Sequence, residues 1–543
     1  MARDFEADRA AVRAVYAAAQ RGDHAHAGEL AAAALADGLE HPLLYNIAAL
    51  KLEQAGRVHE ALGLLEQAVR IAPADVGARN ALGLVLLQLE RPAEALEQFD
   101  ALLKLNPALA YAHASRGNAL LALGALTQAE GSYQRALSLD PHQGAALAGL
   151  ARIATHRGAY REAREWAEQS LAVLPGLPDA LMSLAAVELR ERQAPQAEQR
   201  MRMLLNDGRL SAHERANANG LLGDTLDAQQ RQDEAFAAYS ACNAQLQHLY
   251  ADRYRTGDNA LEYVRAITRY FEQARPEEWQ LPRGSAAAAG NVHGHIFVLG
   301  FPRSGTTLLE VILAGHPQVV SLEANESLID SVRKFMRRPE DLESLRCASA
   351  AELEAARAHY WWQVASAGAD VAGKVFVDEH PLNTLKLPLI ARLFPTARIL
   401  FACRDPRDIV LSCFRHRFRM SAPIFELLSI EGAARYYDAV MQLLIRLTSV
   451  LALDICLVRH EDVVGEFARE MQRVCEFLGL QWTPAMGDFA LRTQSPAMAP
   501  STAELVRGLN TEGIGQWRRY RAQLAPVEAA LSPWVQRFYY DVE

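Results

Sequence analysis

The sequence predicts an all-α helical-repeat solenoid over residues 1–245, followed over residues 291–543 by an α/β three-layer domain with a parallel sheet and a P-loop-like anion site. Two observations support this prediction: a 34-residue period runs through the first half, and apolar runs alternate with helical patterns in the second half. Residues 246–290 are expected to form a helical connection and a linker, because Pro282, Gly284 and an alanine run end the helical pattern there.

The first half repeats its residue types every 34 positions, in several phases of one register. Small residues let two amphipathic helices approach each other, and a proline ends the second helix of each unit. Prolines stand at Pro73, Pro107, Pro141 and Pro175, and alanines at Ala27, Ala61, Ala95, Ala129, Ala163 and Ala197. Four residues after five of these alanines come Leu65, Phe99, Tyr133, Ala167 and Met201.

This pattern, complete in NALGLVLLQLERPAEALEQFDALLKLNP (80–107), resembles the tetratricopeptide repeat family over roughly residues 5–245. Ala235 and Tyr239 indicate one more repeat, offset by four residues. The resemblance implies a concave surface that holds a peptide or protein, and the alternative is a solenoid that only supports its neighbour.

The composition limits the partners that the chain is expected to bind. A net charge of −9 argues against a general nucleic-acid or acidic-membrane binder. The six cysteines are scattered without metal-ligand spacing, so a reducing compartment fits them best. No secretory signal is visible, and the apolar run Leu443–Val458 contains Arg446 and Asp454. We therefore expect a cytoplasmic protein with no nucleic-acid or membrane partner and no metal site.

Strands and helices are expected to alternate through the second half, which favours a parallel sheet covered on both faces. Ligands of such sheets bind at the carboxyl ends of the strands. Strands are expected within HIFVLG (295–300), Lys374–Val377, 397–403 and 454–460. Helices are expected at Leu308–Ala314, Ala351–Ser366, Leu382–Leu393, Arg407–Phe414, Ala433–Leu447 and Val463–Leu478.

The loop after the first of these strands, within HIFVLGFPRSGTT (295–307), has the spacing of a phosphate-binding GxxxxG loop. Its backbone N–H groups and the start of the next helix offer partial positive charge to an oxyanion. Arg303 adds a full charge, and Thr306 and Thr307 add hydroxyl donors. The lysine of a nucleotide triphosphatase is replaced by Thr306, which disfavours ATP chemistry and leaves a kinase or NTPase with a variant loop as an alternative.

A second anion-binding position is expected at the end of the strand 397–403. The segment CRDPRDIVLS places Arg404 at the carboxyl end of this strand and Ser412 two helical turns later. A guanidinium and a hydroxyl in these places are able to hold one phosphate. The other interpretation is a surface pair of Arg404 with Asp405 and a polar residue on a helix.

Together these segments resemble the sulfotransferase family over about residues 293–525. In that family the first loop holds the 5′-phosphosulfate of 3′-phosphoadenosine 5′-phosphosulfate (PAPS), and the Arg/Ser pair holds its 3′-phosphate. The resemblance implies PAPS as co-substrate, bound at the first site by Arg303, Ser304, Gly305, Thr306 and Thr307 and at the second by Arg404 and Ser412.

Within the family the likeness is greatest to tyrosylprotein sulfotransferases, through the first loop and helix and through STAELVRGLNTEGIGQW (501–517). This likeness implies that Ser501 or Thr502 hydrogen-bonds the transferring group. It also implies cofactor contacts from Arg507, at the position of a binding lysine, and from Trp517. The other interpretation is a surface loop with a packed tryptophan.

Two positions depart from the family's pattern. The family's catalytic glutamate falls on Ala324, so Glu323 is the favoured general base and Glu326 the alternative. A lysine that stabilises the leaving group is replaced by Glu379, and His380 follows it.

His380 is expected to act as a base or proton donor, with a packed turn histidine as the other interpretation. Lys374 or Lys386 is near enough in sequence to supply the missing charge. Arg303 is the candidate to stabilise the transferring group.

The resemblance implies transfer of a sulfuryl group from PAPS to an acceptor hydroxyl, such as a tyrosine of a protein presented by the solenoid, without a metal. A carbohydrate, a lipid or a small phenol is an equal alternative as acceptor. The rival hypotheses are a noncatalytic repeat scaffold with a degenerate sulfotransferase domain and the variant-loop kinase or NTPase.

Overall fold

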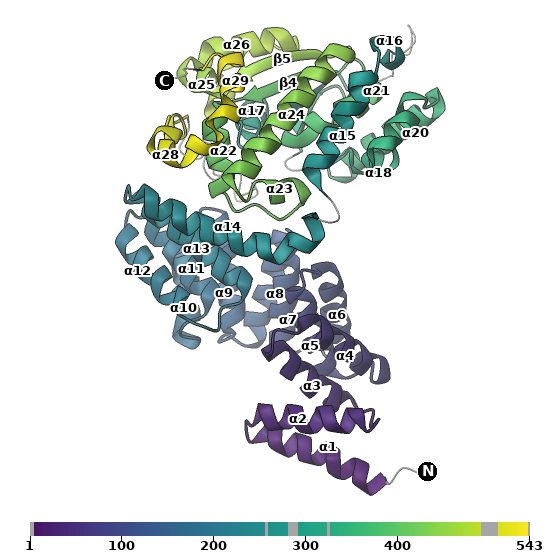
Figure 1. The fold of residues 1–543 in the computed structure, drawn as a ribbon, viewed down its shortest axis with the longest axis vertical. Helices are drawn as coiled ribbons and strands as arrows, with labels where there is room; N and C mark the ends of the chain where they lie inside the picture. Colours follow the sequence, from purple (N-terminus) through teal and green to yellow (C-terminus); the bar gives the residue numbers. More distant parts are fainter. Residues whose placement is uncertain (1–4, 256–258, 281–291, 323–325, 490–508, 541–543) are drawn as a thin grey trace. The chain divides into compact units, whose positions relative to one another are not determined.

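The structure is a computed structural model that describes residues 5–255, 259–280, 292–322, 326–489 and 509–540. The chain forms two compact units, which Figure 1 colours along the sequence. The first unit ends at Glu191 and the second begins at Arg192, except that residues 156–158 group with the second. The boundaries expected from the sequence, at residues 245 and 291, stay predictions.

The first unit consists of consecutive helices at a repeating spacing, as the sequence predicts for a solenoid. Its helices are α1 (Phe5–Gln20), α2 (His24–Ala36), α3 (Pro42–Gln54), α4 (Val58–Ile71), α5 (Val76–Gln88), α6 (Pro92–Leu105), α7 (Ala110–Ala122), α8 (Leu126–Leu139), α9 (Gly144–His156), α10 (Tyr160–Val173) and α11 (Pro178–Arg190). The second unit begins with α12 (Ala194–Leu205), α13 (Ala212–Ala228), α14 (Gln232–Arg255), α15 (Ala260–Gln273) and α16 (Pro276–Trp279).

The periodic residues lie where the helices touch. All six periodic alanines are buried, with 0% of their surface exposed. Pro107 stands two residues after Leu105, the last residue of α6, where a missing N–H group interrupts no helical hydrogen bond. A Cβ atom at Gly83 would come within 2.6 Å of the Phe99 ring, so the ring of one helix fills the space that a small residue leaves on another.

The small residue at Gly117 in α7 is expected to be essential for packing. A Cβ there would come within 2.5 Å of the Tyr133 ring, which is fully buried and whose OH donates to Asn118 Oδ1 at 2.7 Å. We expect Gly117→Ala to lower the free energy of unfolding by about 1–3 kcal/mol, because the ring cannot move away. The measurement is chemical unfolding followed by circular dichroism.

The matched control is Gly131→Ala in α8, where a Cβ would meet nothing within 4 Å. Removing a helical glycine there should stabilise the protein by up to about 1 kcal/mol. Effects of the same sign in the two variants would contradict this account of the packing.

The helices α13 and α14 form the further repeat that Ala235 and Tyr239 predict. Ala235 is fully buried, Tyr239 is 1% exposed, and the Tyr239 OH donates to Asp224 Oδ1 at 3.0 Å. A Cβ at Gly223 would come within 2.5 Å of the Tyr239 ring. The contact between a small residue and a ring therefore recurs in this last helix pair.

The second unit contains, among its described residues, a five-stranded parallel sheet in the order β2-β3-β1-β4-β5. Its strands are β1 (Gly294–Leu299), β2 (Val319–Ser321), β3 (Val375–Glu379), β4 (Arg398–Cys403) and β5 (Asp454–Arg459). The parallel sheet is confirmed. The strand β2 was not predicted, because an edge strand of three residues is too short to carry a periodic signal.

The central strand β1 pairs with β3 and with β4. Val298 lies opposite Glu379 of β3, and Leu299 lies opposite Phe401 of β4. The strands β3 and β4 lie on opposite sides of β1. The direction in which successive strands are added to the sheet therefore reverses at β1. Ligands of open parallel sheets bind in the crevice at the carboxyl ends of the strands at such a point.

Helices cover both faces of this sheet (Figure 1). On one face, Val298 and Leu400 pack in one apolar cluster with residues of α17 (Thr306–Leu313) and α26 (Phe467–Leu478). On the other face, Phe297 lies 5.8 Å from Phe394, measured between ring centroids, at the end of α21 (Leu387–Leu393). The three-layer α/β domain is therefore confirmed.

The second unit contains further helices among its described residues. They are α18 (Ile329–Phe335), α19 (Leu342–Arg346), α20 (Ala350–Ser366), α22 (Pro406–Arg415), α23 (Ala422–Glu426), α24 (Ile430–Val450), α25 (His460–Gly465), α28 (Arg521–Leu524) and α29 (Glu528–Arg537). Short 3-10 helices are η1 (Pro339–Asp341), η2 (Pro381–Lys386), η3 (Pro484–Asp488), η6 (Gln516–Tyr520) and η7 (Ala525–Val527). The helix expected over Leu382–Leu393 therefore divides into η2 and α21, and the one over Val463–Leu478 into α25 and α26.

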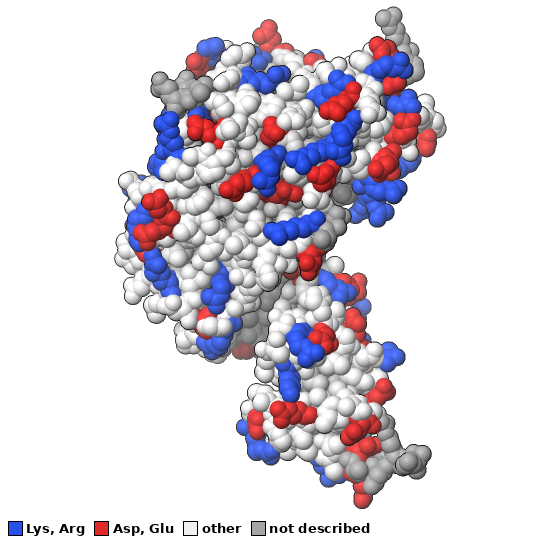
Figure 2. Space-filling model, in the orientation of Figure 1, with Lys and Arg blue, Asp and Glu red and all other residues white. Residues whose placement is uncertain are grey.

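Basic and acidic side chains are interspersed over the face of the molecule that Figure 2 shows. Within the described residues, none of the helices is long and apolar enough to cross a membrane. The cytoplasmic location expected from the sequence stays a prediction.

Candidate functional site

The connections after β1, β3, β4 and β5 lie at the carboxyl end of the sheet, because the strands are parallel. The loop 300–305 follows β1, His380 follows β3, Arg404 follows β4 and His460 follows β5. Three of these four positions belong to the predicted site, and the fourth, His460, does not.

The loop after β1 has an unusual backbone conformation. Arg303 has φ +70° and Gly305 has φ +105°, and the left-handed region is costly for an arginine. Gly300 is enclosed more tightly, since a Cβ there would come within 2.5 Å of Ser304 Oγ and 2.6 Å of the Ala402 carbonyl oxygen. The two glycines are thus required by the close approach of the loop to β4 and by its turn.

Hydrogen bonds within the domain hold this loop in place. Phe301 N donates to Ser304 Oγ at 3.3 Å, so the predicted cofactor hydroxyl of Ser304, which is 1% exposed, takes part in the turn itself. Thr384 Oγ1 donates to the Gly300 carbonyl oxygen at 2.6 Å. Thr306 is buried and Thr307 half-buried, both in the first turn of α17, whose N-terminus carries partial positive charge.

The two predicted arginines and the predicted serine lie together. Arg303 Nε donates to Ser412 Oγ at 3.0 Å, and Arg404 Nη1 donates to the Arg303 carbonyl oxygen at 3.2 Å. Arg404 also donates through Nη2 to the Gly513 carbonyl oxygen, and its Nε is buried without a partner among the described residues. Arg303 and Ser412 are predicted from sequence to belong to separate anion sites, whereas in the structure they are in contact.

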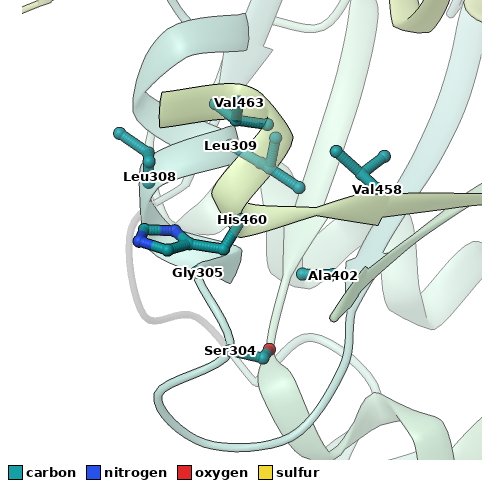
Figure 3. A pocket seen from close by; sticks show the side chains of 8 residues that line it. All are labelled: Ser304, Gly305, Leu308, Leu309, Ala402, Val458, His460 and Val463. Carbon is teal, nitrogen blue, oxygen red and sulfur yellow. The ribbon is translucent and has the colours of Figure 1, made fainter. Parts of the chain in front are cut away.

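His460, the first residue of α25, is a candidate that the sequence analysis missed. Its ring lies beside Gly305 in a small recess (Figure 3), and a Cβ on Gly305 would come within 2.9 Å of its Nδ1. Burial, together with the charges of Arg404 and Arg303, lowers the pKa of His460 to about 3, so the ring is neutral above that pH. The recess is lined by Ser304, Gly305, Leu308, Leu309, Ala402, Val458, His460 and Val463.

The Nδ1 atom of His460 is buried without a hydrogen-bond partner among the described residues. This neutral imidazole lies beside two arginines and has a ring nitrogen without a partner among the described residues. It is able to donate a hydrogen bond to a ligand in the loop or to accept one from it. Its place as the last residue of the strand expected at 454–460 was the only sequence signal for it.

Glu326 and His380 form a pair on the other side of β1. His380 Nε2 lies 3.4 Å from Glu326 Oε1, and the two side chains are 26% and 49% exposed. The hydrogen bond with His380 is the largest of the effects that lower the pKa of Glu326 to about 2. Glu326 is therefore an ionised carboxylate at neutral pH, within reach of solvent and next to a histidine.

Lys386, at the end of η2, is the lysine that lies near this pair. Burial lowers the pKa of Lys386, and the nearby charges of Glu326 and Asp378 oppose that effect. Glu379, at the position of the family's lysine, is buried at the carboxyl end of β3. Lys374 directly precedes β3 and so lies at the opposite, amino end of the strand. Of the two lysines considered from sequence, only Lys386 is placed to replace the missing charge.

Comparison with known families agrees with this geometry. A profile of the sulfotransferase family matches residues 295–484, which include the loop, both arginines, His380 and His460. Residues 295–484 form a sulfotransferase-family domain. Tetratricopeptide repeat profiles match residues 48–110, 80–144 and 120–173 of the same chain.

Several relatives resemble this chain at low identity. A protein of unassigned function from Aquifex aeolicus (strain VF5) is 25% identical over 336 residues, covering 60% of this chain and 42% of that protein. The protein-tyrosine sulfotransferase of Drosophila melanogaster is 25% identical, covering 41% and 46%. Protein-tyrosine sulfotransferase 1 of Danio rerio is 24% identical, covering 45% and 72%. The chain thus spans less than half the length of the first two relatives.

The solenoid resembles solved repeat proteins. The crystal structure of a tetratricopeptide repeat protein from Parabacteroides merdae ATCC 43184 aligns with a TM-score of 0.36 at 19% identity, covering 44% of this chain and 93% of that one.

Trp517, at the start of η6, lies in the second unit beneath an arginine. The Arg407 Cζ atom is 3.6 Å from the centroid of the Trp517 ring, and the tryptophan is 5% exposed. Its backbone N donates to Asp408 Oδ1 at 2.8 Å. The ring is thus packed on one side, and its role as a cofactor contact stays a prediction.

Four of the residues predicted for the sulfotransferase site lie outside the described residues, namely Glu323, Ser501, Thr502 and Arg507. Their roles stay predictions. In the part of the chain that is described, His, Cys, Asp and Glu side chains form no group of three or more suited to hold a metal ion.

Proposed function

We propose that this protein transfers a sulfuryl group from PAPS to an acceptor hydroxyl, and that a protein tyrosine is the first acceptor to test. The observation that carries the proposal is the meeting of Arg303, Ser412 and Arg404 at the carboxyl end of the sheet, inside a sulfotransferase-family domain. The likeness to protein-tyrosine sulfotransferases supports the choice of acceptor.

The described residues fit a donor that carries separate anionic groups. The loop offers backbone N–H groups, the start of α17 and the Arg303 guanidinium to one oxyanion. Arg404 has a buried Nε atom without a partner among the described residues, which is a donor available to a second anion. Ser412 and His460 lie beside these arginines and add neutral hydrogen-bonding groups.

The reaction would need little more than position and charge from the protein. A bond forms between the acceptor oxygen and sulfur, the bond between sulfur and the donor phosphate oxygen breaks, and the acceptor proton passes to a base. Arg303 stabilises the negative charge near the loop. Glu326 is the described residue best suited as base, because it is ionised, half exposed and oriented by His380.

Lys386 takes the place of the cation that Glu379 cannot supply. Its ammonium group interacts with Glu326 and Asp378, which places positive charge on the β3 side of the loop. Lysine is a point charge on a flexible stem, so it can serve this role from a position seven residues away in sequence.

The tetratricopeptide repeats support the proposal of a protein or peptide partner, since stacked helical repeats present extended binding surfaces. We propose that it presents the acceptor polypeptide. The helices of the first unit would then select the substrate, and the sulfotransferase domain would modify it.

Calorimetry of the full chain tests the donor assignment. We expect adenosine 3′,5′-bisphosphate, the product of the donor, to bind more tightly than Mg-ATP, because the loop lacks the lysine of nucleotide triphosphatases. A preference for Mg-ATP would overturn the proposal in favour of a kinase or NTPase.

Transfer itself is tested with PAPS labelled in its sulfuryl group and a panel of tyrosine peptides, carbohydrates, lipids and phenols. Label on a tyrosine peptide is the expected result. Tight bisphosphate binding without label on any acceptor would instead favour the noncatalytic scaffold.

A further inference from the structure

We propose that Asp227, in helix α13 of the last repeat, is a positioning residue for the donor site. Asp227 Oδ2 pairs with Arg415 Nη2 at 2.8 Å, and its Oδ1 accepts a hydrogen bond from Tyr520 OH at 2.6 Å. The side chains of Asp227 and Arg415 are only 11% and 18% exposed. The inference rests on the proposed function, because it assigns Asp227 to the same site.

The two hydrogen-bond partners of the Asp227 side chain belong to the segments that hold the predicted donor residues, and so does Arg519, whose Nη2 lies 3.7 Å from Asp227 Oδ2. Arg415 is the last residue of α22, one turn after Ser412. Tyr520 is the last residue of η6, whose second residue is Trp517. The Asp227 carboxylate of α13 is therefore bonded to both segments.

These two segments are also tied to each other. Arg415 Nη1 donates to Gln516 Oε1 at 2.8 Å, and Asp408 Oδ2 in α22 accepts from Gly515 N at 2.6 Å. Asp408 is 1% exposed, so the carboxylate that receives the C-terminal segment is inside the protein.

The same segments end at the two arginines of the loop. Ser412 Oγ of α22 accepts from Arg303 Nε at 3.0 Å, and the carbonyl oxygen of Gly513, just before η6, accepts from Arg404. A shift of α22 or of 513–517 would therefore move the hydrogen-bond partners of both guanidinium groups. Because charged groups at a binding site must be held within a fraction of an ångström, such a shift weakens ligand binding.

The sequence of the repeats sets Asp227 apart. With the offset that relates Ala235 to Ala197, the matching positions of the preceding repeats are Leu189, Thr155 and Leu121. The carboxylate at 227 is thus not part of the repeat pattern. The hydrogen-bond partners of this buried carboxylate lie in α22 and η6. Leaving Asp227 or Arg415 unpaired inside the protein is costly, so the pair holds these segments in place.

The test measures the Kd of adenosine 3′,5′-bisphosphate by calorimetry and the KM and kcat for PAPS, using the full chain. We expect Asp227→Ala to raise Kd and the KM for PAPS roughly tenfold, while kcat at saturating PAPS changes less than about twofold. Asp227→Glu should restore part of the affinity, because it returns the charge to Arg415.

The matched control is Asp224→Ala, one turn earlier in α13. Asp224 Oδ2 pairs with Arg417 Nη2 at 2.8 Å, beyond the end of α22. The substitution therefore removes a similar ion pair from the same helix. We expect its Kd to stay within about twofold of wild type while its thermal midpoint falls as in Asp227→Ala. If Asp227→Ala does not fold, Tyr520→Phe removes one of the two bonds and should raise Kd measurably.

The outcomes separate this inference from the proposed function. Wild-type protein that fails to bind the bisphosphate overturns both. Binding that Arg404→Ala weakens, but that Asp227→Ala and Tyr520→Phe leave unchanged, overturns only the positioning role. Equal losses in the variants of Asp224 and Asp227 also overturn it, because they would show a general effect of stability.

Discussion

Glu326→Gln should lower kcat for sulfuryl transfer by about 10²- to 10⁴-fold, the usual contribution of a general base. Glutamine keeps the size of the side chain but cannot accept the acceptor proton. The structure favours Glu326 because its carboxylate is ionised, half exposed and 3.4 Å from His380 Nε2. The measurement is the initial rate at saturating PAPS, with the Kd of adenosine 3′,5′-bisphosphate expected to stay within about twofold of wild type.

The pH dependence of the same reaction follows from the His380 contact. Because that hydrogen bond is the main cause that holds the pKa of Glu326 at about 2, the base stays ionised throughout the mildly acidic range. In His380→Gln the pKa of Glu326 should rise toward the ordinary value of about 4.3. The rate is lost as pH falls through the pKa of the base. In this variant kcat/KM should therefore begin to fall at a higher pH than in wild type.

Glu323→Gln is the parallel variant for the base, because Glu323 is the candidate that the family pattern favours. Loss of activity in Glu323→Gln with a wild-type rate in Glu326→Gln would contradict the assignment to Glu326. An acid limb at the same pH in wild type and His380→Gln would contradict the role of the histidine contact.

Arg404→Ala should weaken binding of adenosine 3′,5′-bisphosphate by about 10- to 100-fold, since a hydrogen bond to a charged group contributes about 1.5–3 kcal/mol. Two effects combine in this variant. The buried Nε that is available to an anion is lost, and the carbonyl oxygens of Arg303 and Gly513 lose their donor. The weaker binding of the variant should also depend less on salt. Calorimetry at two ionic strengths measures both effects.

The matched control for this prediction is Arg398→Ala, at the opposite end of the same strand. Arg398 Nε lies 3.8 Å from Asp454 Oδ2, with its side chain 43% exposed, so its removal takes the same charge from the amino end of β4. Bisphosphate affinity should stay near the wild-type value in this variant. Similar losses in Arg398→Ala and Arg404→Ala would mean that net charge, and not a site at the carboxyl end, governs binding.

The repeat architecture could be predicted from the sequence because its contacts are local. The residues Gly83 and Phe99 touch at a fixed distance along the chain, and the same distance separates Gly117 from Tyr133. A period therefore translates directly into packing. The strand β2 escaped prediction, because a short edge strand is defined by its neighbour β3 and not by its own residue pattern.

The candidate site was predicted in part. The motif residues Arg303 and Arg404 follow strands, and Ser412 lies in the helix after the second of these strands, and those places can be read from apolar runs. The bond from Arg303 to Ser412 joins residues 109 positions apart, which no local pattern reports. His460 was missed for the same reason, because its proximity to Gly305 depends on β5 lying next to β4.

The sequence alone determined that this chain is a repeat solenoid followed by an α/β domain with a glycine-bearing loop after its first strand. These features follow from the periodicity of apolar and small residues along the chain. Only the tertiary structure decided that Glu326 meets His380, that Lys386 lies beside them, and that Asp227 of the last repeat reaches Arg415. Polar contacts of this kind are selected by how whole helices and strands pack, so the residue pattern of each segment carries no record of its partner.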